Sequence, residues 1–192
     1  MPIRGHADIQ CCSLYEGVLF STGNVTIDGY NTVIIPEEPC DRYPGDCLLN
    51  SFRLGNSIIC GRKPSKAIIE LAEKNDFELI MTNQGYAKCS CAIIDKHTVI
   101  TADRSIASAL ENTCDILLIN EGGIELPGYS YGFIGGTCGK IRNDKLLFFG
   151  NPLRHPDGRA IVSFIEKHDC DIVSVKDGDL FDFGGFIPLF EE

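Results

Sequence analysis

No apolar stretch of the sequence approaches the roughly 20 residues that a membrane-spanning helix needs, so we expect no transmembrane helix and no membrane partner. The first residues, Met1 to His6, lack the apolar core of a secretion signal, which favours a cytoplasmic protein. Basic residues are scarce too: 17 Lys and Arg stand against 27 Asp and Glu, and the formal net charge is −10. Because this charge repels a phosphate backbone, we also expect no nucleic-acid partner.

Cysteine, in contrast, is abundant, with ten in the chain, but its spacing does not fit a zinc ribbon. Cys11 and Cys12 are adjacent, and Cys89 and Cys91 are separated by one residue. Without a secretion signal, these thiols are expected to be free in a reducing compartment. Cys89 and Cys91 would lie on the same face of a strand. Two interpretations remain: the four thiols hold a metal together, or each is simply a small apolar residue of the core. We predict no metal and no cofactor.

The chain repeats itself loosely. Five stretches that open with small and polar residues lie near His6, Asp46, Cys89, Gly135 and Phe181, at steps of 40, 43, 46 and 46 residues. A period in this range indicates one supersecondary unit that is copied around an axis or along a stack. The length, with 44% hydrophobic and 23% charged residues, suits a single globular domain over residues 1–192.

Each full unit is predicted to run strand, strand, helix, strand. The clearest one has strands over 48–54, 57–60 and 77–81 and a helix that begins near Pro64. The next two units repeat this order, with strands over 90–94, 98–101, 115–119, 140–142, 146–149 and 171–175 and helices near 104–110 and 156–168. The first unit, with strands over 18–20 and 32–35, lacks a helix, and the fifth stops just after 186–190. We therefore expect one α/β domain.

Cys89 and His6 are the candidate catalytic residues. A cysteine becomes a nucleophile when a nearby cation favours its thiolate, and Lys88 precedes Cys89. His6, with Asp8 two residues further on, opens the corresponding stretch two units earlier. Equivalent strand edges in a ring of units would line one channel, which predicts that His6 and Cys89 meet. The alternative is that both residues are structural.

The remaining histidines and the glycine-rich segment 132–139 are weaker candidates. His97 follows a turn, His168 suits a helix C-terminus, and His155 precedes a helix. A dinucleotide-binding loop needs a helix immediately after its glycines. A strand and a hairpin are predicted after residue 139, so that function is rejected.

The motifs resemble those of the pentein superfamily of guanidino-group-modifying enzymes, and most closely an uncharacterised bacterial branch of it. Residues 5–8, Gly-His-Ala-Asp, resemble the element that carries the catalytic histidine of agmatine deiminases and their relatives. Residues 85–90, Gly-Tyr-Ala-Lys-Cys-Ser, resemble the stretch that carries their nucleophile. Residues 133–137, Phe-Ile-Gly-Gly-Thr, resemble their acidic Gly-Gly element. The resemblance covers nearly the whole chain.

The resemblance implies an α/β propeller of five units around a pseudo-fivefold axis, here circularly permuted because the Gly-Gly element follows the Cys89 unit. The missing parts of the fifth unit would precede His6, so we expect a ring that is shortened at its N-terminus or covered by a partner. Because an open ring exposes strand edges, a homo-oligomer is expected.

The resemblance also implies a reaction. Cys89 would attack the carbon of a small cationic guanidino or amidino compound, His6 would act as acid and base, and Asp8 would orient the cation. Ile134 and Thr137, however, stand where those enzymes place acids. Asp46 and Asp182 are candidates to provide the missing carboxylate, and Thr137 stays a candidate substrate-binding residue. Two functions result: a guanidine hydrolase or amidinotransferase, or a non-catalytic pentein that serves in binding or assembly. Ile134 favours the second, whereas the presence of His6, Asp8 and Cys89 together favours the enzyme, which is the leading hypothesis.

Overall fold

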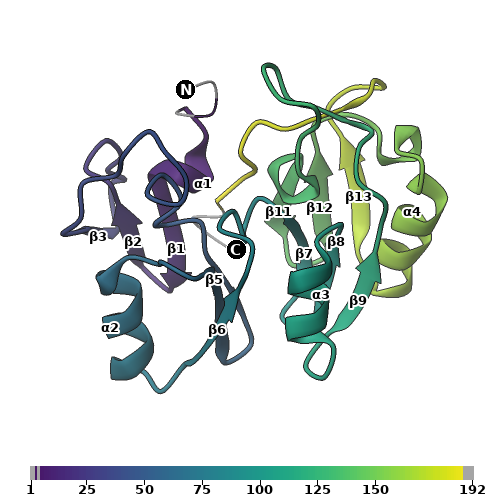
Figure 1. The fold of residues 1–192 in the computed structure, drawn as a ribbon. Coiled ribbons are helices and arrows are strands. Elements are labelled where there is room, and N and C mark those ends of the chain that lie inside the picture. Colours follow the sequence, from purple (N-terminus) through teal and green to yellow (C-terminus); the bar gives the residue numbers. More distant parts are fainter. Residues whose placement is uncertain (1–2, 4, 188–192) are drawn as a thin grey trace.

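The computed structural model describes residue 3 and residues 5–187, which form a mixed α/β structure of small sheets (Figure 1). Four of the sheets have three strands, and a fifth has two. Each three-stranded sheet begins with an antiparallel hairpin, and its third strand then lies parallel to the second after a crossover. This topology recurs four times along the chain.

The elements follow one another in the order of the predicted units. The first unit contains α1 (Ala7–Gln10), β1 (Cys11–Tyr15), β2 (Val18–Ser21) and β3 (Asn31–Ile34). The second contains β4 (Phe52–Leu54), β5 (Ser57–Gly61), α2 (Lys66–Lys74) and β6 (Glu78–Thr82). The third contains β7 (Cys91–Asp95), β8 (Thr98–Thr101), α3 (Arg104–Leu110) and β9 (Asp115–Leu118). The fourth contains the 3₁₀ turns η1 (Ile134–Gly136) and η2 (Pro152–Arg154), with β11 (Cys138–Arg142), β12 (Lys145–Phe148), α4 (Gly158–Lys167) and β13 (Asp171–Ser174).

Local signals explain the helices of the second and third units. The Ser65 side chain caps α2 by accepting a hydrogen bond from the Ala67 N–H, and Asp103 caps α3 by accepting from the Ser105 and Ile106 N–H groups. The predicted order of strand, strand, helix and strand is therefore found in the second, third and fourth units.

Several boundaries differ from the prediction. In the second unit the first strand begins at Phe52 and not at Leu48, because residues 48–50 lie in a turn closed by the Asn50 N–H and the Cys47 carbonyl. Helix α4 begins at Gly158, two residues after Pro156. The short α1, β10 (Ile124–Glu125) and β14 (Leu180–Phe181) were not expected. The expected segment 186–190 lies partly outside the described residues, and residues 186–187 are not in a strand.

Core packing joins successive units. One apolar cluster combines Leu14 and Phe20 of the first unit with Ile58 and Ile68 of the second. A second cluster links the second unit to the third, and the largest links the third to the fourth. Because each sheet buries its faces against its neighbours, the units depend on one another for stability.

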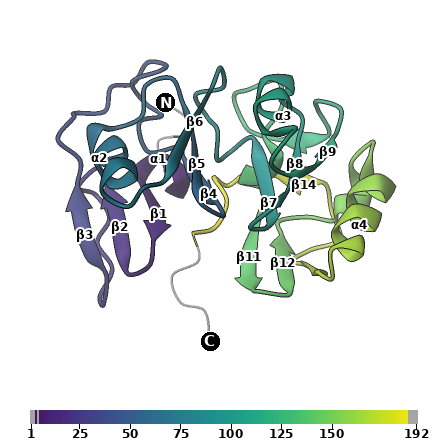
Figure 2. The same cartoon turned by 90° about the horizontal axis from the view of Figure 1, so that it is seen from below.

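The last described segment runs between the first two units and the last two (Figures 1 and 2). Within it, β14 pairs in parallel with β10, and Leu180 is fully buried in the core of the third and fourth units. The Phe183 and Gly185 N–H groups donate to the Gly136 carbonyl. The same segment contacts the first unit, since Asp182 lies 3.7 Å from His6, and it therefore joins the fourth unit to the first.

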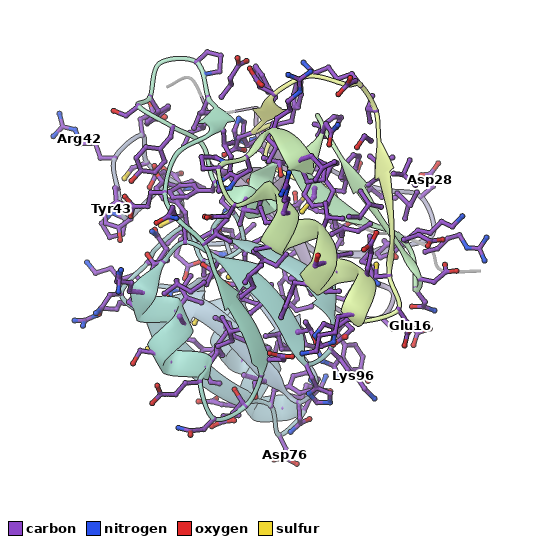
Figure 3. All side chains as sticks on the ribbon, turned by 90° about the vertical axis from the view of Figure 1, so that its right-hand side faces the viewer. Glu16, Asp28, Arg42, Tyr43, Asp76 and Lys96 are labelled. Carbon is purple, nitrogen blue, oxygen red and sulfur yellow. The ribbon has the colours of Figure 1, made fainter. Side chains whose placement is uncertain are left out.

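Charged side chains project outward from the loops, as Glu16, Asp28, Asp76 and Lys96 do in Figure 3. Within residue 3 and residues 5–187, no helix combines the length and apolarity required to cross a lipid bilayer.

The close approach of η1 to the third unit yields a testable prediction. A Cβ atom on Gly135 would collide with the Cys91 and Lys88 carbonyl oxygens, which are backbone atoms and cannot move aside cheaply. We expect Gly135→Ala to lower the free energy of unfolding by about 2 kcal/mol or more. Gly178→Ala is the matched control, because a Cβ there meets only the flexible Lys176 side chain at 3.6 Å. Urea denaturation of both variants checks this, and equal midpoints would contradict it.

Candidate functional site

Several residues around Cys89 and Asp8 occupy equivalent positions before the first strands of their sheets. Cys89 lies two residues before β7, as Asn50 does before β4 and Gly136 before β11. Asp8 and Lys88 share the position one residue earlier in their units. The repeat therefore directs the side chains of different units to the same region.

Three of these side chains form a buried hydrogen-bonded cluster. The Cys89 thiol donates to Asp8 Oδ2 across 2.8 Å and accepts from Asn50 Nδ2 at 3.0 Å. The Asn50 amide also donates to the Asp8 carbonyl, and its Oδ1 accepts from the Cys89 N–H, both at 3.0 Å. All three side chains are at most 3% exposed. Asn50 thus holds the Cys89 thiol and the backbone of both Cys89 and Asp8.

The pKa values of both acidic groups in this cluster, the Asp8 carboxyl and the Cys89 thiol, are raised. Burial raises the pKa of Asp8 to about 7, against the opposing effects of Lys88 and of the thiol hydrogen bond. Burial, together with the charges of Asp8 and Asp182, raises the pKa of Cys89 well above that of a free thiol. Asp8 Oδ1 has no hydrogen-bond partner among the described residues. The site therefore holds a carboxylate oxygen ready for a donor, next to a neutral thiol.

His6 pairs with a carboxylate from the other end of the chain. His6 Nδ1 lies 3.7 Å from Asp182 Oδ1. Burial lowers the pKa of His6, and the Asp182 charge opposes this shift. Asp182 is itself 1% exposed and accepts from the Phe133 and Gly184 N–H groups, each at 2.9 Å.

Glycines make room for this pair. A Cβ on Gly136 would overlap the Asp182 carboxylate, and a Cβ on Gly184 would overlap the His6 side chain. Gly184 also has a φ of +84°, which L side chains rarely adopt. The Gly-Gly element therefore seats the Asp182 carboxylate.

His6, Cys89 and Asp182 line one cavity of about 290 Å³. Tyr86 and Phe133, whose ring centroids are 6.1 Å apart, line it as well. A thiol, an imidazole and a carboxylate therefore line one cavity together with aromatic rings.

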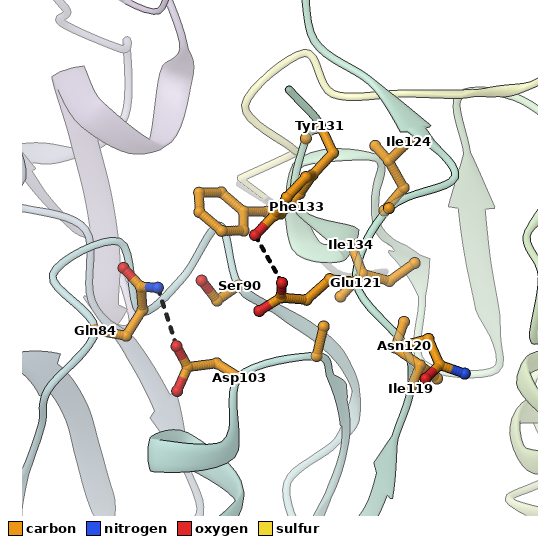
Figure 4. Close-up of a pocket in the computed structure, with 13 residues that line it drawn as sticks. Gln84, Ser90, Asp103, Ile119, Asn120, Glu121, Ile124, Tyr131, Phe133 and Ile134 are labelled. Atoms are coloured by element: carbon orange, nitrogen blue, oxygen red, sulfur yellow. Dashed lines mark hydrogen bonds between the residues drawn. The ribbon is translucent and has the colours of Figure 1, made fainter. Parts of the chain in front are cut away.

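A smaller cavity of about 150 Å³ adjoins the first, because Tyr131 and Phe133 line both (Figure 4). The Tyr131 hydroxyl donates to Glu121 at 2.9 Å, and Gln84 donates to Asp103 at 3.0 Å. Ser90 lines this second cavity and Cys89 the first, so two consecutive residues face different spaces.

The other predicted substrate-binding residues lie elsewhere. Asp46 is buried and accepts a hydrogen bond from the Tyr86 hydroxyl at 2.5 Å, which places it behind the wall of the cavity. Thr137 is fully buried, and its hydroxyl donates to the Ile134 carbonyl at 2.7 Å. Ile134 itself belongs to the core of the third and fourth units. Neither Asp46 nor Thr137 lines the larger cavity.

Asn50 was not singled out in the sequence, where it falls within the predicted strand 48–54. Its place in the second unit, equivalent to that of Cys89 in the third, is the signal that points to it.

The remaining histidines take structural places. His168 ends α4 and lies 3.0 Å from Asp115, His97 is exposed, and His155 is buried with its Nδ1 accepting from the Asp157 N–H. Over residue 3 and residues 5–187, no three or more His, Cys, Asp or Glu side chains are grouped to hold a metal ion.

Fold and site together define a mixed α/β protein of recurring small sheets with a thiol, carboxylate and imidazole cluster between them. The chain belongs to the family described as "Family of unknown function (DUF6873)", whose sequence model matches residues 1–187. No curated protein matches the sequence.

Among solved structures, the chain is similar to a serine-for-cysteine variant of agmatine deiminase from C. jejuni with substrate bound. The TM-score is 0.45 and the identity is 12%, over 79% of this chain and 56% of the deiminase chain. The chain therefore spans little more than half of that protein's length.

The electrostatics of the cluster predict how Cys89 reacts. Replacing Asp8 by Asn removes the negative charge beside the thiol, so the pKa of Cys89 should fall and its alkylation at pH 8 should accelerate several-fold. Lys88→Met should slow it, because Lys88 lowers the pKa of Cys89. Peptide mass spectrometry after iodoacetamide treatment resolves the individual cysteines, and the exposed Cys40 is the internal control. An unchanged or slower rate in Asp8→Asn would contradict this account.

Proposed function

We propose that this protein is a cysteine-dependent enzyme that acts on a guanidino or amidino group, built as a circularly permuted pentein-like propeller. The observation that carries the proposal is the single cavity shared by Cys89, His6 and Asp182, with Asp8 bonded to the thiol. The motifs of the sequence and the fourfold recurrence of one sheet topology support the scaffold.

The charges favour a cationic substrate. Asp182 lines the cavity, whereas Asp8 lines another cavity, of about 340 Å³, and reaches the thiol by its hydrogen bond to Cys89. Both carboxyl groups are buried, and Asp8 Oδ1 is unpartnered among the described residues. A guanidinium would satisfy these oxygens with charge-assisted hydrogen bonds. Its positive charge would also offset the carboxylates that raise the pKa of Cys89, so the thiolate would form when the substrate is present.

The proposed reaction uses these side chains. The Cys89 proton passes to His6, whose imidazolium is stabilised by Asp182, and the sulfur attacks the guanidine carbon. His6 returns the proton to the departing ammonia, which leaves an N-alkylamidino group bound to sulfur. His6 then takes a proton from water, and the hydroxide displaces the thiolate to release an alkylurea. The thiolate recovers its proton from His6, and the proton that the guanidinium carried leaves with the ammonia as ammonium. If the alkylamine departed in place of ammonia, an unsubstituted amidino group would stay on sulfur, and a second amine in place of water would accept it in an amidino transfer.

Removing the nucleophile tests the reaction. We expect Cys89→Ala to lower ammonia release from alkylguanidines by more than about a thousandfold, because the covalent step is lost. Cys40→Ala, at an exposed thiol, is the control and should keep wild-type rates. Intact-protein mass spectrometry of the wild type should show the amidino adduct. Absence of turnover and of any adduct across a panel of guanidines and amidines would favour a non-catalytic binding or assembly role, which the buried apolar Ile134 suits.

The pKa of Asp8 predicts the pH dependence of binding. A carboxyl group with a pKa of about 7 is largely neutral at pH 6 and charged at pH 8, while an alkylguanidine stays cationic throughout. Affinity for the cation should therefore rise several-fold from pH 6 to pH 8, and Asp8→Asn should flatten this rise. Calorimetric titration of Cys89→Ala with pentylguanidine measures it. An affinity that falls with pH would exclude Asp8 as the partner of the cation.

A further inference from the structure

We infer that the substrate carries no carboxylate and has an apolar or aromatic tail, a conclusion that rests on the proposed function and narrows its substrate class. The larger cavity has its charged groups at one end only. His6 and Asp182 are the charged or titratable side chains beside the Cys89 thiol, and among the described lining residues there is no Lys or Arg.

The opposite wall of the cavity is apolar and aromatic. It is formed by Leu126, Tyr129, Tyr131 and Phe133. Tyr129 is 44% exposed and Tyr131 37%, whereas Cys89 is 3% exposed, so the tyrosines lie at the mouth and the thiol at the base. A substrate with its cation at the base would lay its tail along these rings.

Two cations among the described residues have other partners. Lys88 donates to the Gly135 carbonyl at 3.1 Å and does not line the cavity. Arg154 lies 3.8 Å from Asp177 and lines a cavity that adjoins this one, because Leu126, Tyr129 and Ser130 line both.

The charged side chain that contacts Tyr131 is an acid, because Glu121, which lines the adjoining smaller cavity, accepts the hydrogen bond of the Tyr131 hydroxyl. A substrate carboxylate would lose its hydration there without gaining a cationic partner. The site therefore discriminates against guanidino acids and accepts neutral alkyl or aryl tails.

A matched pair of ligands tests this. Pentylguanidine and its ω-carboxylated counterpart share the same cationic head and chain, and phenethylguanidine provides an aromatic tail. In calorimetric titrations of Cys89→Ala, we expect pentylguanidine and phenethylguanidine to bind at least tenfold more tightly than the guanidino acid.

A gain-of-binding variant separates charge from shape. Tyr129→Arg would place a cation at the mouth, and it should bring the guanidino acid to equal or tighter binding than pentylguanidine. Tyr15→Arg, at a similarly exposed tyrosine in β1 outside the cavity, is the control and should leave the preference unchanged.

The outcomes distinguish the inference from the proposed function. If the guanidino acid binds the Cys89→Ala protein as tightly as pentylguanidine, the inference is overturned while the guanidine site stands. If Tyr129→Arg and Tyr15→Arg shift the preference equally, the cavity mouth does not set it, and the inference is likewise overturned. If no guanidine binds any variant, the proposed function itself fails, and the inference fails with it.

Discussion

The hydrogen bond between the Cys89 thiol and the Asp8 carboxylate is the interaction on which the rest of the site depends. It joins residues 81 positions apart and so connects the first unit to the third. A carboxylate as buried as that of Asp8 is costly unless it is paired. Asn50 of the second unit donates to the Cys89 thiol and to the Asp8 backbone carbonyl, and so holds the two residues of this pair in place. Three successive units must therefore be in register before this carboxylate is tolerated, which couples the fold to the chemistry.

The carboxylate beside His6 comes from Asp182, far along the chain from the histidine. The Gly-Gly element provides no acid of its own, since Ile134 points into the core. Its glycines instead leave a space that the carboxylate from the last described segment enters, held by two backbone N–H groups. Backbone donors are fixed in direction, so this carboxylate faces His6 with little freedom to turn away. The negative charge of the cavity thus depends on backbone geometry as much as on an acidic side chain.

The sequence was sufficient for the order of elements but not for all of the site. Hairpin turns, helix caps at Ser65 and Asp103, and apolar spacing are local signals, and they predicted the second to fourth units within a few residues. The short α1 and β14 were missed because elements of four and two residues are stabilised by packing and not by their own propensity. The raised pKa of Cys89 could not be foreseen, since desolvation depends on how neighbouring units close over it.

The contact of Gly184 with His6 has a consequence for the order in which the protein matures. Residues 6 and 8 leave the ribosome long before residue 182, and the first two units can pack against each other through their own apolar cluster. The His6 imidazole, however, pairs with the Asp182 carboxylate only after residues 180–185 have packed against His6. A nascent chain whose first two units have packed together therefore still lacks the His6–Asp182 pair until residues 180–185 have been synthesised and have docked.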